Sequence, residues 1–223
     1  MERFLVFHTR YKDVQLGYFE DQNLIELHTI DSVKVSKSLL ITIDAVFKKF
    51  DISLKDVSFF AAHSGPAPYT TLRVVLATLN GINFSVGTPL IGVNGLEAFL
   101  KNLGQDRPNV VLLNAFGNDL YYGISVPSSP QFIFGCKNGE LLLNELAHDF
   151  PGTINFFGNG SIIYKDKIQQ ILGSNASIPA ETDSVFSGYS NAGIVPIEWV
   201  GQEALKKWHN KKIEQELFPV YLK

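Results

Sequence analysis

The chain has 223 residues, of which 45% are hydrophobic and 18% are charged, and its formal net charge is -3 at pH 7. This composition supports a sizeable core in one large domain or two small lobes, and it excludes a disordered chain. The charge gives no sign of the clustered basic surface that nucleic-acid-binding proteins carry, so any contact with RNA would be local or shared with a partner.

Cysteine content and the N-terminus indicate the compartment. The single cysteine, Cys136, excludes an internal disulfide framework, and Met1-Glu2-Arg3 leads into a strand pattern without an apolar targeting segment. No run approaches the roughly 18 consecutive apolar residues of a membrane span. We therefore expect a cytoplasmic protein that does not associate with membranes.

The first hundred residues alternate between strand and helix patterns. Three strands open the chain as antiparallel hairpins, and a helix, a strand, a second helix and a further strand follow. The predicted strands are 4–7, 14–19, 23–27, 57–62 and the apolar run that starts at Pro89, and the predicted helices are 35–50 and 71–84.

The second half repeats this order of elements. Its predicted strands are 109–113, 120–126, 132–134 and 152–157, and its predicted helices are 141–147, 165–172 and 199–208. Two openings of three strands, each followed by helices and strands in alternation, indicate a duplicated α/β unit. Gly104, Asp106 and Pro108 cluster between the halves, so we expect an N-terminal lobe of residues 1–103 and a C-terminal lobe of residues 104–223.

A Gly-Pro turn separates the fourth strand from the second helix. Residues 65–68 read GPAP, which continues neither a strand nor a helix, and Thr70 or Thr71 is suited to cap the helix that follows. The first amides of a helix therefore lie just beyond the end of a strand.

Four short motifs resemble the TsaB (YeaZ) family. The sharpest is GPAPYTTLRVVLATLNGIN at 65–83 followed by PLIGVNGLEAF at 89–99. The others are ISLKDV at 52–57, FFGNG at 156–160 and the ending FPVYLK at 218–223. They occur in the family's order along the whole chain, and the length also fits.

The resemblance implies a fold and a function. The fold is the duplicated actin-like, sugar-kinase-like (ASKHA) α/β architecture of two lobes, with mixed sheets flanked by helices. The function is that of a non-catalytic subunit that pairs with TsaD, works with TsaE and supports transfer of a threonylcarbamoyl group to the adenosine next to the anticodon of tRNAs. The chemistry would belong to TsaD, tRNA would be reached only through the complex, and the chain would form a homodimer when alone.

Departures from the superfamily pattern argue against a nucleotide site. The turn after the first strand reads His8-Thr9-Arg10-Tyr11, where an Asp and small residues are expected to approach metal and phosphates. The loop before the second helix also differs from the family. It has Ala67-Pro68 in place of Gly-Ser and Thr71 in place of Gly, and Pro68 has no amide hydrogen to donate. We therefore predict no catalytic residue, no cofactor and no metal, and keep an ATP-dependent phosphotransferase of the ASKHA superfamily as the alternative.

Other sites of possible chemistry have simpler interpretations. The five histidines are scattered singly rather than at the spacing of a metal site. A peptidase-like enzyme using Ser64 or Cys136 would lack a convincing base. Residues 158–161, GNGS, have the composition of a phosphate cradle or of a plain turn, and we interpret them as a turn.

The helices at 35–50 and 71–84 carry more apolar residues than a single stripe requires. Either a partner covers the second face or both helices are sandwiched within the fold, and the residues alone do not decide between these. The TsaB resemblance implies that this helix pair binds TsaD. The predicted partner-binding residues are Val35, Ser36, Leu39, Leu40, Ile43, Tyr69, Leu72, Arg73 and Leu76.

Overall fold

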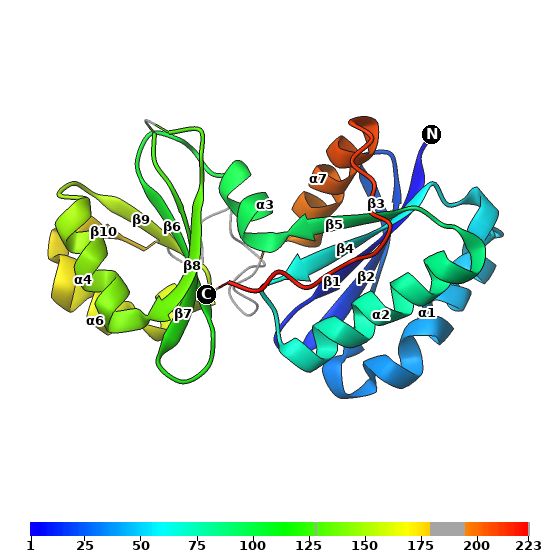
Figure 1. The fold of residues 1–223 in the computed structure, drawn as a ribbon, viewed down its shortest axis with the longest axis horizontal. Coiled ribbons are helices and arrows are strands. Elements are labelled where there is room, and N and C mark those ends of the chain that lie inside the picture. Colours follow the sequence, from blue (N-terminus) through cyan, green and yellow to red (C-terminus); the bar gives the residue numbers. More distant parts are fainter. Residues whose placement is uncertain (128, 179–194, 223) are drawn as a thin grey trace. The chain divides into compact units, whose positions relative to one another are not determined.

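The computed structural model describes residues 1–127, 129–178 and 195–222, which form two compact units. The first unit contains residues 1–95 and 196–220, and the second contains residues 96–195 and 221–223. Each unit is built on its own five-stranded mixed sheet with helices packed against it (Figure 1).

The first unit has the strand order β3-β2-β1-β4-β5. The strand β2 is antiparallel to both β1 and β3, whereas β4 is parallel to β1 and to β5. Its elements are β1 (Arg3–Thr9), β2 (Asp13–Glu20), β3 (Asn23–Asp31), η1 (Ser32–Lys34), α1 (Val35–Phe50), η2 (Leu54–Asp56), β4 (Phe59–Gly65), α2 (Tyr69–Val86), β5 (Leu90–Asn94) and α7 (Ile197–His209).

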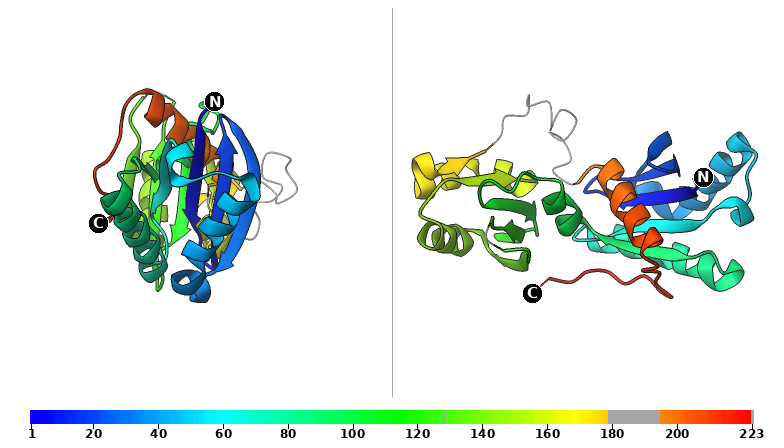
Figure 2. Two further views of the ribbon diagram at one scale, coloured as in Figure 1. Left: turned by 90° about the vertical axis from the view of Figure 1, so that its right-hand side faces the viewer. Right: turned by 90° about the horizontal axis from the view of Figure 1, so that it is seen from above.

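Both faces of this sheet are covered by helices (Figure 1, Figure 2). Because side chains alternate along a strand, Leu5 and Phe7 of β1 join the core under α1 and α2, while Phe4 points the other way and stacks on Phe59 at 4.5 Å. Trp208 of α7 stacks on Phe59 at 5.0 Å, which places α7 on the face opposite α1 and α2.

The position of α7 changes the division of the chain. The predicted lobes were 1–103 and 104–223, but the units divide at Gly95, and residues 196–220 return to the first unit. Residues 196–220 return to the first unit because the face of its sheet opposite α1 and α2 is apolar. On this face Phe19 lies against Gly201, and Gly17 lies against Ile197. This face needs a cover, and α7 provides it from the end of the chain.

A C-terminal strap follows α7 along the first unit. Glu214 donates its amide to the carbonyl of Leu90, and the Glu214 carboxylate accepts the amide of Gly92 at 3.0 Å. Leu217 is buried in the core, and Val220 donates its amide to the carbonyl of Ser64 at 2.8 Å. The strap, residues 210–220, thus closes the free edge of β5 and contains the first three residues of the FPVYLK motif. The last residue of the motif, 223, lies outside the described residues.

Asn80 of α2 holds the strap in place. Its side chain donates to the carbonyl of Leu217 at 3.0 Å and accepts the Leu217 amide at 2.8 Å. We expect Asn80→Ala to lower the free energy of unfolding by about 2 kcal/mol, because both backbone groups of Leu217 lose their partner. Urea unfolding measures this change. Asn144→Ala, which removes one local bond to Glu140 on the exposed side of a helix, is the control and should change stability by less than about 0.5 kcal/mol.

The second unit has the strand order β10-β9-β6-β7-β8, which is the order of the first sheet read from the other edge. The helices α4 and α6 contribute to the core on one face, and α3 places Leu96 and Leu100 against Gly123 of β7. Its elements are α3 (Gly95–Lys101), β6 (Asn109–Asn114), β7 (Asp119–Ser125), β8 (Ile133–Asn138), α4 (Gly139–Asp149), β9 (Ile154–Phe157), α5 (Asn159–Ile163), α6 (Lys165–Leu172), η3 (Gly173–Asn175) and β10 (Ala176–Ser177).

The repeated strand order confirms the predicted duplicated α/β fold. The helices predicted at 35–50 and 165–172 have those bounds, and the one predicted at 71–84 begins earlier, at Tyr69, with Pro68 rather than a threonine at its N-cap. The short elements α3, α5 and β10 were not predicted, since segments of two to seven residues carry too little periodicity. In the described part of the chain, no helix has both the length and the apolar character of a membrane span.

Candidate protein-binding face

The helices α1 and α2 lie next to each other on the first sheet (Figure 1). Each keeps apolar side chains exposed. Leu40 and Ile41 of α1 are 59% and 68% exposed, and Phe84 of α2 is 93% exposed. Exposed apolar groups that recur on neighbouring helices are typical of an interaction surface. We call the exposed side of this helix pair, with Leu40, Ile41, Tyr69, Ala77 and Phe84, the helix face.

The structure divides the nine predicted partner-binding residues into two groups. Five of them point into the core of the first unit and have no side chain available to a partner: Val35, Leu39, Ile43, Leu72 and Leu76. The other four are exposed: Ser36, Leu40, Tyr69 and Arg73. The residues at every third or fourth position of each helix therefore pack on the sheet, and those between them remain at the surface.

Three exposed apolar residues of this helix pair were missed by the sequence reasoning: Ile41, Phe84 and Val86. Ile41 follows Leu40 on α1, and Phe84 lies near the end of α2. The sequence does hold one sign that Ile41 is exposed. The buried residues Leu39 and Ile43 are four positions apart on one side of the helix, and Ile41 lies between them on another side. Such a residue is either exposed or buried by a second layer, and only the packing decides which.

A cation–π contact orders the start of α2. The guanidinium of Arg73 lies over the ring of Tyr69, 4.1 Å from its centroid, and the two residues are one helical turn apart. Both side chains are exposed, so the pair presents a flat aromatic group and a positive charge on the helix face.

The turn after β1 does not fit a site for nucleotide and metal. Arg10 closes this turn, donating from its guanidinium to both carboxylate oxygens of Asp13 at 2.6 and 2.7 Å. His8, at the position of the expected acidic residue, is 1% exposed. A buried ring and a paired guanidinium offer no anionic ligand for a cation bound to phosphates.

His8 and His63 form a buried pair at the adjacent ends of β1 and β4. Their rings meet edge to face with centroids 5.0 Å apart, and none of their ring nitrogens has a hydrogen-bond partner among the described residues. Burial lowers the pKa of His63 to about 4. Burial, then the neighbouring His63 and Arg10, lowers the pKa of His8 well below its usual value. Both rings are therefore neutral at pH 7.

The glycines of the GNGS segment are explained by packing. A side chain at Gly158 would overlap the carbonyl oxygen of Leu112, and one at Gly160 would lie 2.8 Å from the Leu112 carbonyl carbon. Asn159 accepts the amide of Asn114 at 3.0 Å. These contacts hold the segment against β6. The segment is not the plain turn that was predicted, because Gly158 is the N-cap of α5 and residues 159–161 are its first residues.

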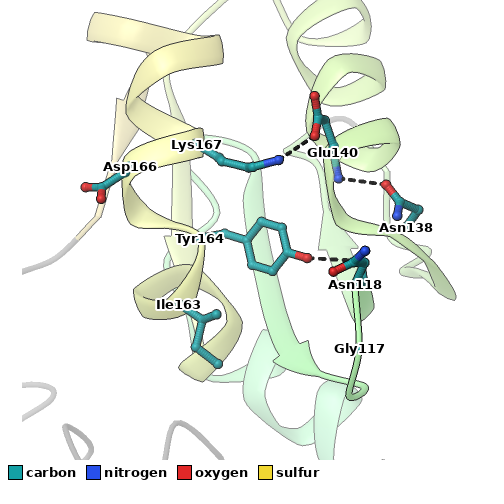
Figure 3. Close-up of a pocket in the computed structure, with 8 residues that line it drawn as sticks. All are labelled: Gly117, Asn118, Asn138, Glu140, Ile163, Tyr164, Asp166 and Lys167. Carbon is teal, nitrogen blue, oxygen red and sulfur yellow. Dashed lines mark hydrogen bonds and ion pairs between the residues drawn. The ribbon is translucent and has the colours of Figure 1, made fainter.

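A polar pocket of about 440 Å³ lies within the second unit. Figure 3 shows Tyr164 between the hairpin after β6 and the start of α6, with its hydroxyl donating to the carbonyl of Asn118 at 3.0 Å. Lys167 and Glu140, which also line the pocket, form an ion pair. The polar groups at this pocket are thus largely engaged with one another, and nothing in it indicates a catalytic group.

Other candidate chemistry lacks the necessary neighbours. In residues 1–127, 129–178 and 195–222, no three histidine, cysteine or carboxylate side chains are grouped as metal ligands. The Ser64 hydroxyl is buried and faces the Ala62 carbonyl at 3.5 Å. Burial and, after it, Asp119 raise the pKa of the Cys136 thiol, which makes it a poor nucleophile at pH 7.

Comparison with solved structures identifies the fold. YeaZ from Pseudomonas aeruginosa superimposes with a TM-score of 0.72 at 16% sequence identity over 100% of both chains. The chain has the YeaZ fold. A second structure from Pseudomonas aeruginosa, an uncharacterized protein described as similar to peptidase YEAZ, gives the same TM-score at 15% identity and full coverage. The predicted resemblance to TsaB (YeaZ) proteins is therefore confirmed at the level of the fold.

More distant comparisons agree with this fold. Lmo2764 of Listeria monocytogenes, provisionally assigned as an N-acetylmannosamine kinase, matches with a TM-score of 0.53 at 12% identity, over 94% of this chain and 99% of that one. The sequence model of the family TsaD, tRNA N6-adenosine threonylcarbamoyltransferase, matches residues 30–127, which is less than half of the chain. A sequence search among curated proteins finds no significant match. The YeaZ fold and the sugar-kinase-like architecture thus agree with the predicted fold class.

Proposed function

We propose that this chain is a TsaB-family subunit that pairs with TsaD through the helix face. In this role it supports transfer of a threonylcarbamoyl group to the adenosine next to the anticodon of tRNAs, with TsaE as a further partner. Catalysis takes place in TsaD, tRNA is reached through the complex, and the complex is cytoplasmic. The observation that carries the proposal is the exposed apolar face of α1 and α2 on a chain with the YeaZ fold along its full length.

The helix face has the properties that a protein interface requires. Leu40, Ile41 and Phe84 supply apolar groups, and Tyr69 with Arg73 supplies the aromatic and guanidinium groups that are enriched in interface centres. Two helices of a partner, packed against α1 and α2, would bury these side chains in a four-helix arrangement. The match of the TsaD family model to residues 30–127, which include both helices, supports the proposal.

The test is the affinity of the complex after a charge is placed in the helix face. We expect Ile41→Glu to weaken binding to the cognate TsaD at least about a hundredfold, because a carboxylate would be buried among apolar groups. Isothermal titration calorimetry measures the affinity, and light scattering after size-exclusion chromatography gives the stoichiometry.

Ile162→Glu is the matched control. Ile162 is 46% exposed on α5 of the second unit, so the same change should leave the affinity for TsaD unaltered. If wild-type chain and folded TsaD remain separate at micromolar concentrations, the proposed function is wrong.

The phosphotransferase alternative rests on the Lmo2764 match. It would require the turn at His8–Asp13 to accept phosphates and a cation, which the Arg10–Asp13 pair and the burial of His8 oppose. Calorimetric titration with ATP and Mg²⁺ separates the two functions, since saturable binding would favour the phosphotransferase.

A further inference from the structure

A dense group of basic residues lies at the end of α7. Residues 206–212 read KKWHNKK, with four lysines, one histidine and no acidic residue, in a protein whose formal net charge is -3. Runs of this kind are typical of surfaces that bind polyanions. Four of these residues are exposed, and we call them the basic turn: Lys206, His209, Lys211 and Lys212.

The backbone holds the basic turn in one conformation. The amide of Lys211 donates to the Trp208 carbonyl at 2.9 Å. The amide of Lys212 donates to the Lys207 carbonyl, also at 2.9 Å, and Asn210 is the C-cap of the helix. These bonds are those of a Schellman motif, which closes a helix with a left-handed residue just after the C-cap. The lysines beyond the helix are therefore positioned before any ligand binds.

Lys211 occupies the position of this motif that usually carries glycine. Its φ is 55°, in the left-handed region that residues with a side chain rarely adopt. A glycine would fit this backbone with less strain, so the stability of the fold does not explain a lysine here. Lysines in the last turn of a helix complement its dipole, which accounts for Lys206 and Lys207 but not for the strained Lys211.

The positive charges of the basic turn are open to a ligand. In the described part of the chain, Lys206, Lys211 and Lys212 form no ion pair. The first acidic residue after the turn, Glu214, is held by the Gly92 amide, which donates to its carboxylate at 3.0 Å. Three exposed lysines of one short segment are thus available to contact the same anionic molecule.

The basic turn fits phosphate groups better than it fits a protein partner. The centres of protein interfaces are apolar and depleted in lysine, and Ile213 is a single exposed apolar residue beside the turn. Phosphates, in contrast, are bound by lysine as a point charge, and release of counterions from a nucleic acid drives the binding.

We infer that the basic turn binds the phosphate backbone of RNA, and that it contacts the tRNA bound by the complex with TsaD. The identity of the RNA rests on the proposed function, in which tRNA is the substrate. Because phosphates are the same in every sequence, this contact positions the RNA without reading its bases. The contact is local, which agrees with the negative charge of the whole chain.

The experiment measures tRNA binding by the complex with TsaD, using fluorescence anisotropy at several salt concentrations. We expect Lys211→Gly to weaken the affinity about fivefold at about 50 mM salt, and to lower the slope of log affinity against log salt by about 1. Lys206→Gln, Lys211→Gly and Lys212→Gln combined should weaken it at least about thirtyfold and lower the slope by about 3.

Two controls separate RNA binding from stability. Lys211→Gly should be at least as resistant to urea as the wild type, because glycine suits the left-handed backbone. Lys165→Gln removes a positive charge at an exposed position of α6 and should leave the tRNA affinity and the salt slope unchanged.

The outcomes distinguish this inference from the proposed function. If the triple variant forms the complex and binds tRNA like the wild type, the inference is wrong and the proposed function stands. Binding to vesicles of anionic lipid without binding to tRNA would assign the basic turn to a membrane surface and also overturn the inference. A chain that binds tRNA through these lysines but does not bind folded TsaD overturns the proposed function and leaves the RNA-binding surface standing.

Discussion

Gly158→Ala is expected to lower the free energy of unfolding by about 4 kcal/mol, one of the two largest effects that we predict. Gly158 has φ 87° and ψ 165°, a backbone conformation that side chains with a Cβ rarely adopt. The added methyl group would also overlap the carbonyl of Leu112, a backbone atom in the centre of the second sheet. That strand cannot move aside without breaking its bonds to β7 and β9, so the strain remains.

Gly152→Ala is the control for this change. A Cβ at Gly152 would have no neighbour within 4 Å, and its φ is not positive. Gly152→Ala should therefore change the free energy of unfolding by less than about 0.5 kcal/mol. Urea unfolding of both variants at pH 7 measures the difference. If Gly158→Ala unfolds like the wild type, the glycine is not needed for packing, and a ligand becomes the better explanation for the segment.

Stability is expected to fall by about 2 kcal/mol between pH 7 and pH 5 because of His63 alone. The pKa of His63 is about 4 in the folded protein and 6.5 when the side chain is free in solution. Between these values the unfolded chain binds a proton that the folded chain does not, so stability is full above pH 6.5 and decreases as the pH falls towards 4. His8, whose pKa is also lowered, adds to the loss in the same direction.

His63→Asn is designed to test the cause of this dependence. The substitution removes the titrating ring but keeps a polar group, so the variant should lose less stability between pH 7 and pH 5 than the wild type, whatever its stability at pH 7. Urea unfolding at a series of pH values provides both curves. His148→Asn is the matched control, since it makes the same substitution at a histidine whose side chain is 88% exposed on α4. Equal slopes for His63→Asn and the wild type would assign the dependence to other groups.

Local patterns in the sequence determined much of the fold. The helices at 35–50 and 165–172 could be predicted to the residue because apolar residues recur at helical spacing over two or more turns. The duplicated order of strands and helices also followed from pattern, and the four motifs indicated the family whose fold the chain has. These features depend on residues that are close together in the chain, so the order of residues is enough to predict them.

The tertiary structure decided which side of each helix is buried. Leu39 and Leu40 are equally apolar neighbours, yet one lies in the core and the other is 59% exposed, because only the orientation of α1 on the sheet distinguishes them. The return of α7 to the first unit likewise depends on Phe19 and Phe59, which are distant in sequence. Burial of His8 against His63 brings together the ends of two strands that pattern alone could not pair. These three features depend on contacts between segments that are far apart in the chain, so they cannot be predicted from the local sequence.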